Sequence, residues 1–304
     1  MTKIIRIGTR DSQLALWQAT TVQGKLEALG YKTELVPVKS TGDLILDKPL
    51  YELGITGIFT KTLDVAMLSG KVDIAVHSMK DVPTALPIGI VQAAVLERAD
   101  TRDILVHPTA PDYFKNCTIA TGSLRRQAQW LHRYPHHKTT DLRGNVNTRL
   151  QKLADSDWTG AIFAKAGLER IDVLPENYSP LDWMTPAPAQ GAMMIEALED
   201  DNFSREACAQ LNHEPTALCT HIEREFLRTL EGGCTAPIGA LATMEDDVIH
   251  FSGVLFSLDG QTKLEVTELV SKHNALGFGT DCALEILDQG GRALMKQIKQ
   301  QTQK

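Results

Sequence analysis

A lysine and an aspartate lie side by side where they could do chemistry. Lys80 and Asp81 belong to VHSMKDVP (76–83), in which a strand pattern ends just before Pro83. Sites in α/β sheets gather beyond the carboxyl ends of strands, and nearby cations would keep Asp81 ionised. A fixed carboxylate can stabilise a developing cation or orient an N–H group. The competing interpretation is an ordinary salt-bridged turn.

A cysteine on a glycine-rich turn is the second candidate. In EGGCTAPIG (231–239), Gly232 and Gly233 permit a turn or a close backbone approach. Cys234 follows them and does not lie on a periodic apolar face, so its thiol could reach a cleft and act as a nucleophile. Most lone cysteines are inert core residues, and no nearby histidine could serve as its base. His77, by contrast, lies within a strand pattern and is predicted to be a core histidine.

The positive charge of the chain is concentrated in one segment. Between Tyr113 and Lys152 there are eight lysines and arginines and one acid, so this basic window carries +7 and the rest of the chain −14. Guanidinium groups suit the oxygens of carboxylates and phosphates. The window favours one anionic ligand over solvated helix faces. General nucleic-acid binding is disfavoured by the acidic net charge and the 6% aromatic content.

Predicted helix starts lie next to arginines. IGTRDSQLALWQA and IATGSLRRQAQW each predict a strand, a threonine, a short turn with a serine, and a helix. Ser12 and Ser123 are candidate N-caps, whose helices leave backbone N–H groups that bind anions. LRGNVNTRL (142–150) predicts a similar turn at Gly144 and Asn145. Ordinary capped helices are the alternative, but two such starts favour a two-lobed cleft. The neighbouring arginines are Arg10, Arg125, Arg126, Arg143 and Arg149.

Alternating strand and helix patterns must position these residues. Strands are predicted at 3–9, 33–38, 73–78, 90–96, 118–121, 139–142 and 160–165, with helices between them. Such alternation predicts mostly parallel sheets covered by helices, so the fold class is α/β. The last third differs, because a helix near 217–230 precedes alternating strands near 248–257 and 263–271 and a final helix toward Ile298. We therefore predict two α/β domains followed by an α+β domain.

The composition excludes several classes of protein. The 304 residues are 43% hydrophobic and 23% charged, which is typical of a globular protein. No apolar run approaches the roughly 18–20 residues of a membrane span, and the first residues, MTKIIRIGTRDS, contain no secretory h-region. Five cysteines without C-x-x-C or zinc spacing indicate free thiols, a cytoplasmic location and no metal.

Taken together, these strings resemble one family over nearly the whole chain, the porphobilinogen deaminases, also called hydroxymethylbilane synthases. The strings, in the family's order and at about its spacing, are TRDSQLALWQA, HSMKDVP, TGSLRRQ, LRGNVNTRL, AGLER, QGA, NHEPT with the following ERE, and EGGCTAPIG. Eight strings in order are highly specific. The resemblance implies a transferase of tetrapyrrole (heme) biosynthesis. It would join four porphobilinogen molecules head to tail, with release of ammonia, into the linear tetrapyrrole hydroxymethylbilane.

The resemblance also implies a covalent dipyrromethane cofactor and a set of site residues. The cofactor is expected on Cys234 through a thioether, which resists hydrolysis, so the cofactor remains as a primer. Asp81 is expected to be the catalytic carboxylate, which contacts pyrrole N–H groups and stabilises the cation formed as ammonia leaves. The implied cofactor-binding residues are Lys80, Asp81, Thr121, Ser123, Arg125, Arg126, Gly144, Asn145 and Gln190. The implied substrate-binding residues are Arg10, Ser12, Arg143, Arg149 and Arg170.

The fold implied by the resemblance is two periplasmic-binding-protein-like α/β domains that flank a cleft, plus a smaller C-terminal α+β domain that carries the cofactor cysteine. The expected domains are 1–97 with a return segment at about 190–213, a basic domain 98–189, and 214–304. The implied protein is a cytoplasmic monomer that binds porphobilinogen, passes its product to uroporphyrinogen-III synthase and binds neither nucleic acid nor membrane. The alternative is a non-enzymatic two-lobed anion-binding protein, whose lobes share this fold.

Four positions depart from the family's pattern. Glu52 and Thr56 stand where the family's glycine-rich loop has lysines, and Lys48 or Lys61 would have to compensate for them. Gly122 replaces a serine and Ala189 a glycine. None of these positions is Asp81, Cys234 or one of the arginines, so activity is still expected.

Overall fold

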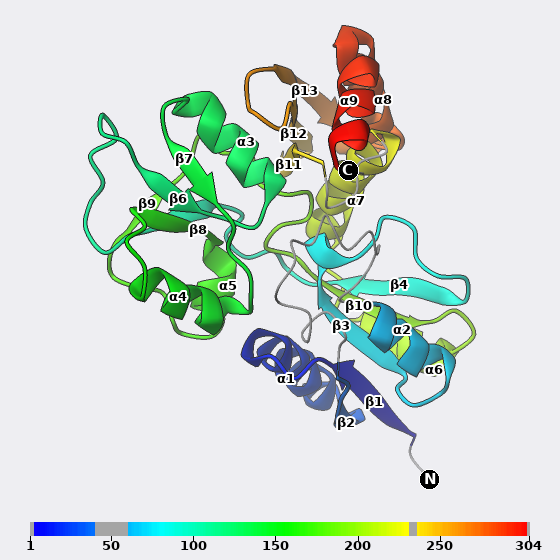
Figure 1. Cartoon of the computed structure of the whole chain (residues 1–304). Helices are drawn as coiled ribbons and strands as arrows, with labels where there is room; N and C mark the ends of the chain where they lie inside the picture. Colours follow the sequence, from blue (N-terminus) through cyan, green and yellow to red (C-terminus); the bar gives the residue numbers. More distant parts are fainter. Residues whose placement is uncertain (1–2, 40–59, 231–235, 303–304) are drawn as a thin grey trace. The chain divides into compact units, whose positions relative to one another are not determined.

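Residues 3–39, 60–230 and 236–302 are described by the computed structural model of the chain, drawn in Figure 1. The chain divides into two units. Of the described residues, the first unit takes those up to Ala99 together with Gly191–Ala217. The second unit takes Asp100–Gln190 and the residues from Leu218 onward. The chain therefore leaves the first unit after Ala99, returns to it at Gly191 and leaves it again after Ala217.

The first unit is built on a five-stranded sheet with the strand order β2-β1-β3-β10-β4. The strands are β1 (Ile4–Thr9), β2 (Lys32–Pro37), β3 (Ile74–Ser78), β4 (Ile90–Val95) and β10 (Met193–Leu198). β1 is parallel to β2 and β3, whereas β10 is antiparallel to both β3 and β4. Because side chains alternate along a strand, Ile74 and Val76 pack on one face and Ala75 on the other. Helices α1 (Gln13–Ala28) and α6 (Asn202–Ala209) cover the first face, and α2 (Lys61–Leu68) covers the second.

The second unit contains another five-stranded sheet, with the order β7-β6-β8-β5-β9. Its strands are β5 (Asp103–Val106), β6 (Thr118–Ala120), β7 (Lys138–Thr140), β8 (Gly160–Ala164) and β9 (Tyr178–Pro180). β6 is parallel to β7 and β8, and β5 is antiparallel to β8 and β9. Helix α3 (Leu124–Arg133) packs on one face through Trp130, while α4 (Val146–Ala154) and α5 (Lys165–Glu169) pack on the other through Leu153 and Leu168.

The two large sheets share one topology. In each, three parallel strands follow the order second, first, third, and an antiparallel strand then pairs with the third. That antiparallel strand comes from another part of the chain, because β10 follows all strands of the second sheet and β5 precedes β6. The sheets are therefore mostly parallel, as predicted, because four strands of each run in one direction and the inserted strand alone runs in the other. β5 and β10 were missed since neither Asp103–Val106 nor Met193–Leu198 alternates polar with apolar residues.

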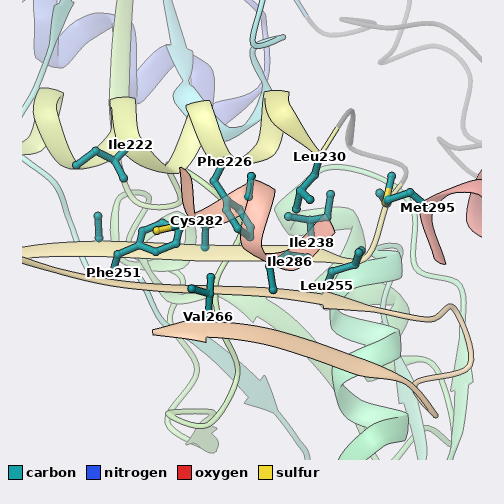
Figure 2. Close-up of a cluster of buried hydrophobic side chains, with 14 of the residues drawn as sticks. Ile222, Phe226, Leu230, Ile238, Phe251, Leu255, Val266, Cys282, Ile286 and Met295 are labelled. Carbon is teal, nitrogen blue, oxygen red and sulfur yellow. The ribbon is translucent and has the colours of Figure 1, made fainter. Parts of the chain in front are cut away.

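The second unit also contains a smaller antiparallel sheet, in the order β11-β12-β13. The strands are β11 (Ile238–Glu245), β12 (Val248–Phe256) and β13 (Lys263–Ser271). Helix α7 (Glu214–Thr229), which begins in the first unit, precedes the sheet. The sheet is followed by η4 (Lys272–Asn274), α8 (Phe278–Ile286), the π-helical turn η5 (Leu287–Gly291) and α9 (Arg292–Thr302). Figure 2 shows Phe226 of α7 and Leu230, the residue after this helix, pointing at the sheet. The rings of Phe226 and Phe251 meet edge to face at 5.2 Å, and Val266, Ile286 and Met295 complete the core.

The predicted fold class is confirmed, since two α/β sheets precede a smaller three-stranded sheet with its own helices. The predicted strands lie within a few residues of observed ones, and α4 (Val146–Ala154) lies between two of them, as predicted. Within the three described ranges, no helix is both long and apolar enough to cross a membrane.

Candidate functional site

Four of the predicted site residues lie at one edge of the first sheet. Arg10 and Ser12 follow β1, and Lys80 and Asp81 belong to the short 3-10 helix η3 (Met79–Asp81) that follows β3. β1 and β3 are neighbouring parallel strands, so their carboxyl ends meet at the same edge. Ser12 is the N-cap of α1, as predicted, and its hydroxyl accepts a hydrogen bond from the Ala15 N–H at 3.4 Å.

The turn that carries Asp81 is held by backbone hydrogen bonds. The Met79 N–H donates to the Ala192 carbonyl at 3.1 Å, which extends the pairing of β3 with β10 by one bond. The Val82 N–H donates to the Met79 carbonyl at 3.2 Å and closes the turn. Asp81 itself is exposed. A fixed backbone therefore presents an accessible carboxylate.

A second group of predicted residues lies at the corresponding edge of the second sheet. Thr121 and Ser123 follow β6, and Arg143, Gly144 and Asn145 follow the neighbouring parallel strand β7. Ser123 caps α3 by accepting from the Arg126 N–H at 3.5 Å, and Asn145 caps α4 by accepting from the Thr148 N–H at 2.9 Å. The predicted cap at Ser123 and the predicted turn before a helix at Asn145 are confirmed, and two helix N-termini, which can bind anions, lie at this edge.

A small cavity lies between the start of α3 and the end of β7. It has a volume of about 140 Å³ and is lined by Thr121, Gly122, Leu124, Gln127, Thr139, Thr140 and Asp141. Its lining is mostly hydroxyl, amide and backbone groups, which suits a polar ligand group. The cavity includes one predicted cofactor-binding residue, Thr121, and one departure from the family's pattern, Gly122.

Backbone geometry and burial determine the contacts and the pKa values of the predicted arginines that follow this edge in the chain. The Arg149 Nε donates to the Gly144 carbonyl at 2.7 Å, across a turn in which Gly144 has φ +115°. A Cβ there would lie 2.7 Å from a methyl group of Thr148, so only glycine fits. Arg143 is buried. Burial lowers the pKa of Arg170, the next predicted arginine along the chain, to about 10.

Two predicted anion-binding arginines point to a buried acid within their own unit. Arg126 donates from Nη2 to Asp103 Oδ1 at 2.7 Å and from Nη1 to the Ile162 carbonyl at 3.0 Å. Arg125 Nη1 lies 2.8 Å from Asp103 Oδ2 and 2.7 Å from the Thr185 carbonyl. Both guanidinium groups are more than nine-tenths buried. These contacts bind the start of α3 to β5, so the pair anchors the helix that Ser123 caps.

Asp103 is the residue that the sequence analysis missed. It is completely buried, and Gln190 also donates to it, from Nε2 to Oδ1 at 2.9 Å. Three predicted residues (Arg125, Arg126 and Gln190) are thus connected through one carboxylate. The sequence did contain a sign of this contact. Asp103 begins the apolar run DILV, and an acid that is buried with such a run needs cationic partners.

Two departures from the family's pattern lie where the backbone is constrained. A Cβ at Gly122 would lie 2.6 Å from the Leu142 carbonyl oxygen, so the family's serine would require the chain to shift here. Ala189 has φ +62°, in the region that favours glycine. Its N–H donates to Glu223 Oε2 at 2.6 Å, and Glu223 also accepts from the Ala242 N–H at 2.7 Å. This carboxylate holds Ala189 in its strained conformation.

We expect Ala189→Gly to stabilise the protein by about 0.5–1 kcal/mol. Relief of a left-handed alanine gains about 1–2 kcal/mol, and the added freedom of glycine in the unfolded chain returns about 0.4–1 kcal/mol. Urea unfolding measures the difference. The matched control is Ala187→Gly, two residues earlier and outside the positive-φ region, which should destabilise. Destabilisation by both changes would contradict the strain at Ala189.

Some of the predicted residues lie outside the part of the chain that the structure describes. They concern Cys234, the expected attachment point of the cofactor, and the loop positions Lys48, Glu52 and Thr56. Lys61, the other lysine considered as a replacement, is the first residue of α2. The remaining predicted residues form two sets, one at the carboxyl ends of β1 and β3 and one following β6, β7 and β8.

Fold and site together define a class of protein. It is an α/β protein that gathers basic, hydroxyl and capped-helix groups at the carboxyl ends of parallel strands, which is typical of sites for anionic small molecules. Comparison with known proteins identifies the family. Residues 5–206 match the model described as "Porphobilinogen deaminase, dipyromethane cofactor binding domain", and residues 217–288 match "Porphobilinogen deaminase, C-terminal domain". The chain belongs to the porphobilinogen deaminase family.

Curated relatives with this name match nearly end to end. The porphobilinogen deaminase of Trichlorobacter lovleyi is 41% identical over 305 residues, which cover 98% of this chain and 97% of the relative. That of Moorella thermoacetica is 41% identical over 308 residues, which cover 99% of this chain and 98% of the relative. The matches therefore cover both described units.

Similar solved structures are more distant. A substrate-binding domain of a putative amino acid ABC transporter from Streptococcus pneumoniae has a TM-score of 0.44 and 10% identity, and covers 68% of this chain and 91% of that chain. The VFT2 domain of Bordetella pertussis BvgS has a TM-score of 0.40 and 11% identity, with coverage of 68% and 86%. Likeness at this level carries no argument about function.

Proposed function

We infer that the chain catalyses the porphobilinogen deaminase (hydroxymethylbilane synthase) reaction of tetrapyrrole biosynthesis. In this transferase reaction four porphobilinogen molecules are condensed head to tail, with release of ammonia, into linear hydroxymethylbilane. The observation that carries the inference is the match of the family's cofactor-binding and C-terminal domains over residues 5–206 and 217–288. The non-enzymatic anion-binding protein remains the second candidate, because the helix caps alone would serve it as well.

The donor groups of the chain fit the dipyrromethane cofactor that the family match implies. Each pyrrole ring carries an acetate and a propionate, and the edge of the second sheet offers hydroxyl groups, helix N–H groups and arginines, which are donors for carboxylates. When bound, the cofactor supplies the pyrrole carbon to which the first substrate is joined. We propose Cys234 as its thioether attachment point.

Asp81 is the catalytic carboxylate in this proposal. Its exposed side chain accepts hydrogen bonds from pyrrole N–H groups and stabilises the positive charge that forms on the substrate as ammonia leaves. Lys80 lies beside it in the same turn. The free α-carbon of the growing chain then attacks this cation. The new C–C bond neutralises the substrate ring and moves the positive charge to the attacking ring, which loses that charge by releasing its α-proton.

The remaining assigned residues bind the carboxylate side groups or position the groups that bind them. Cofactor binding is assigned to Lys80, Thr121, Ser123, Arg125, Arg126, Gly144, Asn145 and Gln190, and substrate binding to Arg10, Ser12, Arg143, Arg149 and Arg170. Among the cofactor residues, Arg125, Arg126 and Gln190 act through their shared anchor Asp103. That anchor fixes the start of α3, whose N–H groups then serve the ligand.

Further proposals concern the organisation and the setting of the protein. We propose the domains 1–97 with a return segment at about 190–213, 98–189 and 214–304, a monomeric state, and transfer of the linear product to uroporphyrinogen-III synthase. A cytoplasmic location is supported by four buried free cysteines, which suit a reducing compartment. They are Cys117, Cys208, Cys219 and Cys282.

Intact mass of the purified protein, followed by peptide mapping around Cys234, tests the proposed function. We expect an excess mass of two linked pyrrole units on Cys234. If the protein is isolated without it, incubation with porphobilinogen should add it, and Cys234→Ser should add nothing in either experiment. If the wild-type protein instead gains no mass and releases no ammonia with porphobilinogen, that result would contradict the proposed reaction and favour the non-enzymatic anion-binding protein.

A further inference from the structure

Three ionisable side chains are buried together in the first unit, away from the assigned residues. Asp64, His77 and Glu196 are 7%, 6% and 0% exposed, and their ligand atoms all lie within 4.8 Å of one another. His77 Nε2 lies 3.1 Å from Glu196 Oε2. Burial of His77 agrees with its predicted place in the core. We call these three residues the buried triad.

The buried triad joins three elements of the unit. His77 is opposite Met194 and Glu196 is opposite Ala75 in the β3–β10 pairing, so both side chains lie on the same face of the sheet. Helix α2 covers that face, and Asp64 projects from it between Leu63 and Met67, two members of its apolar core. The triad therefore binds α2, β3 and β10 to one another within an otherwise apolar layer.

The side chains of the triad are close enough to influence one another electrostatically. Burial and the carboxylate of Glu196 raise the pKa of Asp64 to about 6, while His77 and the Thr60 hydroxyl oppose the rise. Both oxygens of Glu196, Oδ1 of Asp64 and Nε2 of His77 are buried, and the three side chains face one another. Buried carboxylates are costly unless neighbouring groups compensate them. The contacts among the three side chains therefore favour the arrangement in which α2, β3 and β10 stay together.

We propose that Asp64, His77 and Glu196 are positioning residues for Asp81. His77 is the last residue but one of β3 and lies four residues before Asp81. Glu196 lies four residues after Ala192, whose carbonyl accepts the Met79 N–H. By fixing β3 against β10, the triad fixes the hydrogen bond on which the η3 turn is built. The inference rests on the proposed function, because it takes Asp81 to be the catalytic carboxylate.

The test compares Glu196→Leu and Glu196→Gln with Val72→Ala, which removes methyl groups from the same apolar cluster but is not in the triad. Hydrogen exchange of peptides that cover residues 78–82 is measured on each protein, together with kcat and KM for porphobilinogen. We expect Glu196→Leu to speed exchange of the Met79 amide at least tenfold and to lower kcat about 5- to 20-fold with little change in KM. Glu196→Gln, which keeps the shape of the side chain, should restore part of both.

Val72→Ala should lower the melting temperature without either effect. Wild-type exchange and kcat in Glu196→Gln and Glu196→Leu would overturn the proposal, and so would equal changes in Val72→Ala. If Glu196→Leu does not fold, the hydrogen exchange and kcat of Glu196→Gln, compared with those of Val72→Ala, decide whether the triad positions Asp81. A stoichiometric metal ion in the wild type that is lost in Glu196→Gln would also overturn it, because the triad would then be a metal site. Absence of turnover in the wild type would contradict the proposed function. The hydrogen-exchange data would still show whether the triad fixes the turn at residues 78–82.

Asp64→Asn tests whether the triad holds a proton. A carboxyl whose pKa is raised by folding stabilises the folded state below its unfolded pKa, and this contribution is lost as pH rises through the folded value. The melting temperature of the wild type relative to Asp64→Asn should therefore be highest near pH 4 and fall as pH rises through about 6. The groups that face Asp64 are Glu196, His77 and Thr60. A constant difference across this range would show that Asp64 holds no proton in the folded state and would contradict the electrostatic influence within the triad.

Discussion

Asp81→Ala should leave a folded protein that converts almost no porphobilinogen. Asp81 is exposed at the end of a turn whose backbone is held by the Met79 and Val82 hydrogen bonds, so its loss costs little stability. The developing cation, by contrast, loses the carboxylate that compensates it. Removal of one preorganised electrostatic partner typically costs a factor of about 10²–10³ in kcat. Release of ammonia and formation of the tetrapyrrole measure the loss, and thermal unfolding checks the fold.

Asp11→Ala is the matched control for this prediction. Asp11 is also an exposed acid beyond the carboxyl end of a strand in the same sheet, but it has no assigned role. Its variant should keep turnover within about twofold of the wild type. Near-normal turnover in Asp81→Ala would remove Asp81 from the catalytic role, and an equal loss in Asp11→Ala would reduce its role to general negative charge. Asp81→Asn should behave like Asp81→Ala, because the charge and not the shape acts on the cation.

Arg149→Leu should stall chain elongation. Arg149 extends from α4 beside the Gly144 turn and is assigned to the carboxylate groups of the growing chain. A hydrogen bond to a charged group contributes about 1.5–3 kcal/mol, so its loss lowers kcat by a factor of about 10–100. Brief incubation with limiting porphobilinogen, followed by intact mass, should reveal enzyme carrying one, two or three added units. The wild type should show such intermediates only weakly.

Lys152→Leu provides the comparison on the same helix. Lys152 is exposed near the end of α4, and its removal lowers the positive charge of the basic window by the same amount. This variant should elongate normally. If Arg149→Leu merely raises KM with kcat unchanged, the arginine contributes uniform binding and not elongation. Accumulated intermediates in Lys152→Leu would mean that total charge, and not the position of Arg149, sets the rate.

The elements that position the site could be predicted from local patterns. Ser12, Ser123 and Asn145 were placed at helix starts because their side chains satisfy N–H groups there, and all three do so. Lys80 and Asp81 were placed beyond a strand end because the apolar run stops before a proline, and β3 ends at Ser78. Such features depend on neighbours in the chain, which a sequence displays directly.

Contacts between distant segments could not be predicted in this way. The basic window suggested free cations, yet the buried carboxylate of Asp103 neutralises Arg125 and Arg126 from more than 20 residues away. Glu196 meets His77 only because β10 inserts beside β3, and β10 was not recognised as a strand. Each case depends on a pairing between segments far apart in the chain, which local periodicity does not contain.

The origin of β10 has a consequence for synthesis on the ribosome. When residues up to 100 have emerged, β3 and β4 exist but the strand that pairs with both does not, so two unpaired edges are exposed. About 90 further residues, at roughly 5–20 residues per second, must be made before Met193–Leu198 can insert. The sheet that carries Asp81 is therefore completed only after the second sheet has been synthesised. A nascent chain stalled near residue 150 should then be open to proteases in its first hundred residues, and one stalled beyond about residue 250 should be protected.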